Sequence, residues 1–85
     1  MANTIVITSF ARKQLEKLPK DVQVRIMNAI NGLVDISRPN GCKKLKGRKN
    51  AYRIRIGNYR VVYGIEDGLL IITVVAIDKR DSVYD

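Results

Sequence analysis

The hydrophobic period of this chain changes once, and that change limits the folds it can adopt. Apolar residues recur at helical spacing before residue 35, whereas from Tyr52 onward they alternate with polar residues, as in Tyr-Arg-Ile-Arg-Ile. Spacings of three to four residues keep one helix face apolar, and a spacing of two keeps one strand face apolar. The sequence therefore predicts helices followed by a sheet, in a single domain over residues 1–85.

The N-terminal part predicts a short strand and a helical hairpin. Residues 3–8 are β-branched and apolar, which favours a strand, and Ser9 is then the predicted N-cap of a helix. Pro19 ends that helix, and the second helix has Asp21 as its N-cap or begins earlier, at Pro19 or Lys20. Two apolar stripes are predicted to be core, namely Phe10, Ala11, Leu15 and Leu18, then Val22, Ile26, Ala29, Ile30 and Leu33.

The remainder predicts a basic loop and three strands. Residues 37–51 are polar and glycine-containing, Gly57-Asn58 is a tight-turn pair, and residues 69–77 form an apolar run typical of a buried strand. Tyr52, Tyr59 and Tyr63 fall on the apolar side of the alternation. The order β-α-α-β-β-β predicts an α+β domain, with a helical hairpin packed on one face of a mainly antiparallel four-stranded sheet.

Positive charge is concentrated in the centre of the chain. The protein has 16 Lys and Arg, 8 Asp and Glu, no His and a net charge of +8. Residues 36–65 hold nine of the cations and no Asp or Glu, which leaves the remainder at −1. Such a field attracts RNA, DNA, anionic membranes or acidic proteins. A solvated surface is the alternative, although soluble surfaces usually interleave both signs.

The absence of His excludes several classes of chemistry. With one cysteine, Cys42, the chain lacks the ligands of a Cys/His zinc site, the residues of a Ser-His-Asp or Cys-His enzyme, and the partner for an intramolecular disulfide. No apolar run approaches the roughly 20 residues of a membrane span, and the N-terminus does not read as a signal peptide. We therefore expect a cytoplasmic protein without metal, cofactor or membrane partner.

The alternation gathers arginines on one strand face. Arg53 and Arg55 share that face, and a two-residue turn at Gly57-Asn58 sets Arg55 opposite Arg60. Like charges so placed cost up to about 1 kcal/mol, which an anion would offset, and the guanidinium fork suits phosphate. The alternative is that these arginines solvate the strand or hold Asp78. A cationic loop leads into the same strand and predicts a groove for nucleic acid; its members are Lys43, Lys44, Lys46, Arg48 and Lys49.

RNA cleavage through its own 2′-OH is one reaction that this residue set permits. It needs a base for the 2′ proton, cations for the phosphorane, and an acid for the leaving 5′ oxygen. Without His, the base would be a lysine or tyrosine whose pKa nearby cations lower. The candidates are Lys46, Lys79 and the tyrosines.

One string of motifs resembles a known family. Lys43-Lys44-Leu45-Lys46-Gly47, then YRIRIGNYRVVY over 52–63, then KRDSVY over 79–84 are similar to the RelE/ParE toxin superfamily, over almost the whole chain. The resemblance implies a microbial-RNase-like sheet with two N-terminal helices. For the RelE branch it implies an mRNA interferase, a ribosome-dependent endoribonuclease that cuts translated mRNA in the A site. It also implies a RelB-like antitoxin, and operator DNA as a target of the toxin–antitoxin pair.

The resemblance also implies roles for individual residues. Arg60 would stabilise the transition state, and Arg80 would bind phosphate or stabilise the leaving group. Tyr84 would stack on or orient the mRNA base and assist proton transfer. Arg55 joins this catalytic set, and Arg53 joins the loop cations as an RNA- or ribosome-binding residue. Relatives often have lysines at the positions of Arg53 and Arg55, one of them implicated as base; arginine stays protonated, so the base stays open among Lys46, Lys79 and Tyr84.

Two other functions remain open. A ParE-type toxin inhibits DNA gyrase on the same fold, although members of that branch generally lack the arginine–tyrosine set. A non-catalytic domain of this fold would bind RNA without cutting it.

Overall fold

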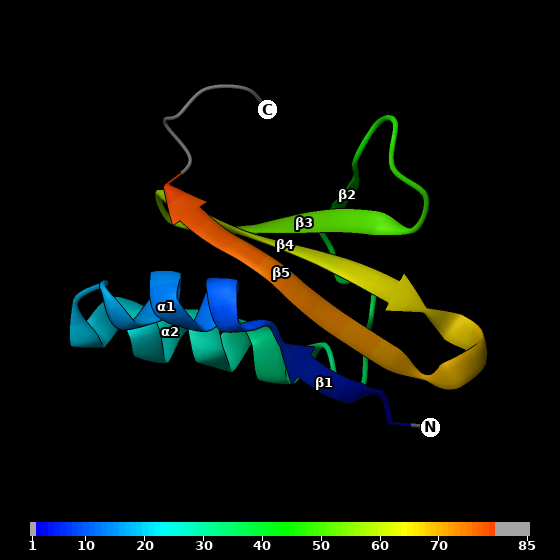
Figure 1. Ribbon diagram of the computed structural model, residues 1–85, viewed down its shortest axis with the longest axis horizontal. Coiled ribbons are helices and arrows are strands. Elements are labelled where there is room, and N and C mark those ends of the chain that lie inside the picture. Colours follow the sequence, from blue (N-terminus) through cyan, green and yellow to red (C-terminus); the bar gives the residue numbers. More distant parts are fainter. Residues whose placement is uncertain (1, 80–85) are drawn as a thin grey trace.

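The computed structural model describes residues 2–79, and in that range two helices pack on a five-stranded sheet (Figure 1). The elements are β1 (Thr4–Ile7), α1 (Ser9–Glu16), α2 (Lys20–Gly32), β2 (Lys43–Lys44), β3 (Ala51–Ile56), β4 (Tyr59–Glu66), the 3₁₀ turn η1 (Asp67–Leu69) and β5 (Ile71–Lys79). The strand order is β1-β5-β4-β3-β2, with β1 parallel to β5 and the other neighbours antiparallel. The predicted α+β class is confirmed.

The sheet has one strand more than predicted. Residues 37–51 do not form a continuous loop, because Lys43 and Lys44 pair with Arg53 and Tyr52 as strand β2. A strand of two lysines has no alternation for sequence analysis to detect. The pairing places β2 beside β3 and so fixes both ends of the cationic loop to the sheet (Figure 1).

The N-cap of the first helix differs from the sequence expectation by one position, whereas the start of the second helix is one of those predicted. Thr8, not Ser9, is the N-cap of α1, because its hydroxyl accepts a hydrogen bond from the Ala11 backbone N–H at 3.1 Å. The second helix begins at Lys20, one of the starts left open, and Pro19 before it supplies no side-chain cap. One hydroxyl residue replaces another, so the error is a single position.

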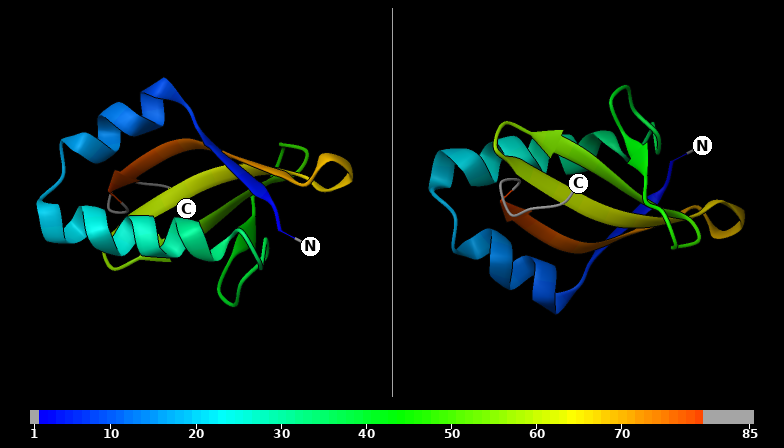
Figure 2. Two further views of the ribbon diagram at one scale, coloured as in Figure 1. Left: turned by 90° about the horizontal axis from the view of Figure 1, so that it is seen from below. Right: turned by 90° about the horizontal axis from the view of Figure 1, so that it is seen from above.

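The core lies between the helical hairpin and one face of the sheet. α1 packs along β5 and α2 against β3 (Figure 2). Ile26, Ile30 and Tyr63 are fully buried, and Tyr52 and Tyr59 pack against the core, as predicted. Phe10 is the exception, since its side chain is 63% exposed. Ala11 and Leu15 define the buried face of α1. Phe10 comes directly before Ala11, so its side chain is rotated about 100° around the helix axis from that face.

Tyr63 gives the fold a measurable pH dependence. Its hydroxyl donates to the Ser37 carbonyl at 2.9 Å, and burial raises the pKa of Tyr63 above its usual value of about 10. The folded state therefore disfavours the ionised form, so this contribution to stability is complete below about pH 10 and declines as the pH rises further.

We expect Tyr63→Phe to lower the free energy of unfolding by about 0.5–1.5 kcal/mol at neutral pH, because one buried hydrogen bond is lost. The variant should also lose less stability than the parent above about pH 10. Urea unfolding at pH 7 and at alkaline pH measures both effects, with Tyr59→Phe as the control. Equal alkaline losses in the parent and in Tyr63→Phe would contradict the assignment.

Candidate functional site

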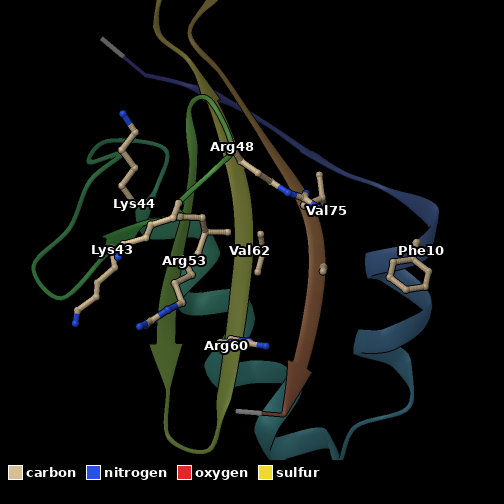
Figure 3. Close-up of a pocket in the computed structure, with 11 residues that line it drawn as sticks. Phe10, Lys43, Lys44, Arg48, Arg53, Arg60, Val62 and Val75 are labelled. Atoms are coloured by element: carbon tan, nitrogen blue, oxygen red, sulfur yellow. The ribbon is translucent and has the colours of Figure 1, made fainter. Parts of the chain in front are cut away.

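A hollow of about 920 Å³ opens on the sheet face that the core does not use (Figure 3). Six cations line it, and none of its lining residues is acidic within the described chain. Its lining residues are Lys43, Lys44, Lys46, Arg48, Arg53, Arg60, Leu45, Phe10, Val62, Val75 and Ala76. The hollow therefore combines a cationic wall with apolar surface.

A β-bulge shapes the floor of this hollow. Val62 pairs with Ala76, but the next residue of β4, Tyr63, pairs with Val74, so Val75 is an extra residue in β5. Val75 and Ala76 both line the hollow. Bulges redirect side chains in this way next to functional sites. The floor depends on how two strands pair, so the local sequence contains no signal for it.

Arg60 lies at the hollow in an ion pair. The predicted hairpin register is confirmed, with Arg55 opposite Arg60. On its other side Arg60 is opposite Asp78, and the Arg60 Nε donates to the Asp78 Oδ1 at 3.0 Å. The alternative that an arginine holds Asp78 is therefore confirmed for Arg60. This carboxylate offsets the repulsion between the two opposed guanidiniums.

The arginine face is less open than the alternation suggested. Arg53 is 5% exposed and Arg60 is 8% exposed, so neither serves as a solvated outer-face charge. Strand β2 and the loop after it line the hollow beside Arg53, and Asp78 flanks Arg60. Buried guanidiniums lose hydration and depend on anionic or polar partners. The interior of the hollow is accordingly a place where an incoming anion gains more than it would at a solvated surface.

The other predicted site residues differ in whether they line the main hollow. Lys43, Lys44, Lys46 and Arg48 line the main hollow, and Lys49 lines a smaller one of about 500 Å³ within the same loop. Arg55 is exposed and does not line the main hollow.

The candidates for the general base lie in different parts of the structure. Lys46 lines the hollow, whereas Lys79 pairs with Tyr59 and follows Asp78, so it lies on the opposite sheet face from Arg60. Arg80 and Tyr84 lie outside the described residues. Within residues 2–79, Lys46 is thus the base candidate at the hollow.

Sequence analysis missed the apolar part of the site. Val62, Val75 and Ala76 gave no local signal. Phe10 was assigned to the core, but the structure places it on α1 at the side of the hollow away from β2 (Figure 3). The sequence contained one signal for this position. Ala11 and Leu15 are four residues apart and share a helix face, and Phe10 lies one residue outside that spacing.

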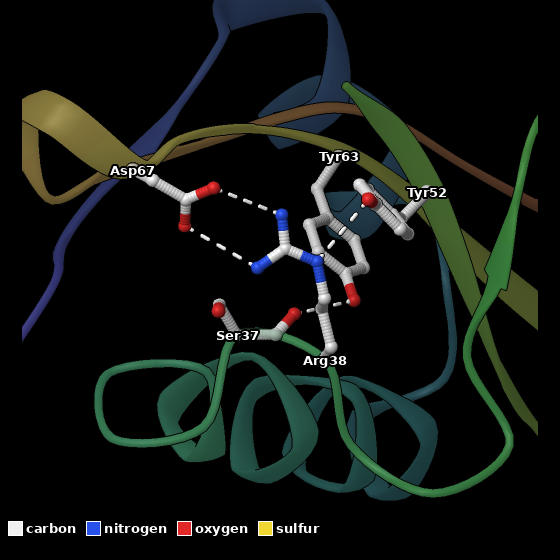
Figure 4. A network of polar contacts seen from close by, with 5 residues as sticks. All are labelled: Ser37, Arg38, Tyr52, Tyr63 and Asp67. Carbon is white, nitrogen blue, oxygen red and sulfur yellow. Dashed lines mark hydrogen bonds and ion pairs between the residues drawn. The ribbon is translucent and has the colours of Figure 1, made fainter. Parts of the chain in front are cut away.

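One cation of the central segment has a structural role instead. Arg38 makes a bidentate ion pair with Asp67, at 2.9 and 3.3 Å, and its Nε donates to the Tyr52 hydroxyl at 3.1 Å (Figure 4). The hydrogen bond to Asp67 raises the pKa of Arg38, and the same bond lowers the pKa of Asp67. This contact ties the segment after α2 to η1. Arg38 does not line the hollow.

Residues 2–79 offer neither a metal-ligating cluster nor a membrane-spanning helix. No group of three or more metal-ligating side chains is present in that range. None of the helices in the same range is long and apolar enough to cross a membrane.

Comparison with known proteins identifies the family. Residues 5–84 match the family described as "ParE toxin of type II toxin-antitoxin system, parDE". Toxin RelE3 of Methanocaldococcus jannaschii is 38% identical over 79 residues, covering 86% of this chain and 85% of that toxin. Toxin RelG of Mycobacterium tuberculosis is 31% identical, covering 99% of this chain and 98% of that toxin.

The fold comparison agrees with the sequence comparison. The crystal structure of the archaeal RelE-RelB complex from Pyrococcus horikoshii OT3 contains a chain that superposes with a TM-score of 0.86 at 26% identity, covering 98% of this chain and 100% of that one. Toxin RelE3 and the Pyrococcus horikoshii complex carry the RelE name, within a family described by its ParE members. The chain therefore belongs to the RelE branch of the RelE/ParE superfamily, the toxins of type II toxin–antitoxin systems.

Proposed function

We propose that this toxin is a ribosome-dependent endoribonuclease that cleaves translated mRNA in the ribosomal A site and so inhibits translation. The observation that carries the proposal is the hollow, in which six cations surround an apolar floor on a RelE-branch chain. A cationic groove with aromatic and apolar surface is typical of proteins that bind single-stranded nucleic acid.

The proposed reaction uses the RNA's own 2′-OH. The 2′ oxygen attacks the adjacent phosphorus, and the bond from phosphorus to the 5′ oxygen breaks. The products are a 2′,3′-cyclic phosphate and a 5′-OH. Arg60 stabilises the charge of the crowded phosphorane through its fork, with Arg53 as a second cation at the hollow.

Proton transfer is assigned to the remaining candidates. Lys46 takes the 2′ proton, since it lines the hollow that holds Arg60. Arg80 and Tyr84 keep the roles that the family resemblance implies. Arg80 contacts the phosphate or stabilises the leaving group, and Tyr84 orients the mRNA base and gives a proton to the departing 5′ oxygen, which leaves as the 5′-OH. Arg55 supports the charge opposite Arg60.

Partners follow from the relatives. The Pyrococcus horikoshii neighbour is a RelE-RelB complex, and on that ground we assign this toxin a RelB-like antitoxin. The ribosome and mRNA are its targets in the cytoplasm, and operator DNA is bound only by the toxin–antitoxin pair. The loop cations Lys43, Lys44, Lys46, Arg48 and Lys49 hold the RNA or the ribosome by charge.

Primer extension on a translated mRNA, with and without the protein, tests the proposal. Cuts in codon register at the A site that need ribosomes are the expected result. Gyrase-dependent DNA damage without mRNA cuts would replace it with the ParE-type function, which the family description favours. RNA binding without any cuts would indicate a non-catalytic domain.

A further inference from the structure

Phe10 is an exposed aromatic side chain at the hollow. Five large apolar side chains are exposed among residues 2–79, and Phe10 is the member of that group that lines the hollow. Its ring extends from α1 on one side, while Lys43 and Arg53 lie on the other (Figure 3). Single exposed apolar residues are common, so the position of Phe10 matters more than its exposure.

The backbone holds this ring on a fixed element. The Thr8 backbone N–H donates to the Val74 carbonyl at 3.0 Å, directly before α1 begins. Farther along α1, the side-chain oxygen of Gln14 accepts a hydrogen bond from the Ile77 backbone N–H at 2.6 Å. This contact lies beyond the last residue pair of β1 and β5. Both contacts tie α1 to β5, the strand that forms part of the floor. Phe10 is therefore presented to the hollow by a helix that is anchored on both sides of it.

We propose that Phe10 is a stacking platform for a nucleobase of single-stranded RNA, in a subsite across the hollow from the phosphate-binding cations. This subsite rests on the proposed function. A nucleotide has an anionic phosphate and a flat apolar base, and the hollow offers cations on one side and an aromatic ring on the other. Val62 and Val75 of the apolar floor lie between Arg53 and Phe10 (Figure 3). Stacking tolerates any base, so this subsite adds affinity without sequence preference.

Charge favours RNA over a protein as the occupant. An apolar side chain of a protein partner would also cover Phe10, but it would leave the six cations of the same hollow to be neutralised separately. Each nucleotide carries both a base and a negative phosphate, so one RNA strand can cover Phe10 and neutralise the cations.

The test measures the binding of an oligoadenylate of about eight nucleotides, within the site sizes of about 4–16 known for single-strand binders. Its sugars are 2′-O-methylated, so that it cannot be cleaved by 2′-OH attack. A strand of the same length and charge without bases is the second probe. Fluorescence anisotropy compares the parent protein with Phe10→Ala, Phe10→Trp and Phe10→Leu, and Leu69→Ala, exposed on η1, is the control variant.

Phe10→Ala should weaken binding of the base-bearing strand by about 5- to 150-fold. It should leave binding of the abasic strand and the salt slope unchanged, because no charge is removed. Phe10→Trp should restore affinity, Phe10→Leu should restore it only in part, and Leu69→Ala should bind like the parent. Thermal unfolding should be the same in all variants.

Equal affinities of the parent and Phe10→Ala for the base-bearing strand would overturn the subsite, and so would equal weakening on both strands. A parent that binds neither strand would overturn the subsite together with RNA recognition by the free toxin. Primer extension with the same proteins reports on cleavage separately. Normal stacking with no mRNA cuts would contradict the proposed function and leave the subsite standing.

Discussion

Arg60→Ala is expected to slow ribosome-dependent mRNA cleavage by about 100- to 1000-fold, the usual cost of removing one preorganised donor from a developing oxyanion. Arg60 is 8% exposed and lies at the hollow, so its charge acts where solvent screening is weak. Single-turnover primer extension on programmed ribosomes measures the rate. Arg60→Lys should recover part of the activity, because the charge returns without the bidentate fork.

The control for this substitution is Asp78→Asn. Arg60→Ala also breaks the 3.0 Å pair with Asp78, and this loss by itself lowers stability. Asp78→Asn removes the same ion pair and keeps the cation, so it should retain cleavage and bind RNA at least as tightly as the parent, since the carboxylate no longer competes with phosphate. Cleavage lost to the same extent in Asp78→Asn and Arg60→Ala, with both proteins folded, would show that the ion pair and not the cation matters.

Neutralising the cationic loop should strongly weaken RNA binding and its dependence on salt. Replacing Lys43, Lys44, Lys46, Arg48 and Lys49 with glutamine removes up to five phosphate contacts. The slope of log K against log salt for single-stranded RNA should become shallower by up to about 3.5, at about 0.7 per phosphate. Affinity near physiological salt should fall by up to about a thousandfold. Anisotropy titrations at several salt concentrations measure both quantities.

A charge-matched variant separates the hollow from the net charge. Replacing the five exposed cations of the helical hairpin removes the same charge elsewhere; they are Arg12, Lys13, Lys17, Lys20 and Arg25. This variant should keep most of the salt slope. Equal losses in the two variants would mean that RNA responds to the charge of the whole protein.

What the sequence predicted correctly depended on local rules. A two-residue turn at Gly57-Asn58 leaves one pairing register, so the opposition of Arg55 and Arg60 followed without coordinates. The stripe of Ile26 and Ile30 likewise followed from helical spacing. Nine cations without an acid in one segment predicted a cationic groove, and six of them line the hollow.

What the sequence did not predict depended on contacts between distant segments. Strand β2 forms by pairing with a strand that comes later in the chain, as Lys43 does with Arg53. The bulge at Val75 forms where the pairing register between β4 and β5 shifts by one residue. The burial of Arg53 is set by elements that are separate in the sequence. Phe10 reaches the hollow because α1 lies beside β5, which helical periodicity alone does not indicate.

The parallel pairing of β1 with β5 sets the order in which this toxin can be completed. Thr4 pairs with Ile71, so the contact closes a loop of 71 − 4 = 67 residues, and strand pairings this distant in the chain form slowly. During synthesis β1 leaves the ribosome first and waits for β5, which also supplies Val75 and Ala76 to the hollow floor. The floor of the hollow is therefore incomplete until β5, the last strand among the described residues, has been translated.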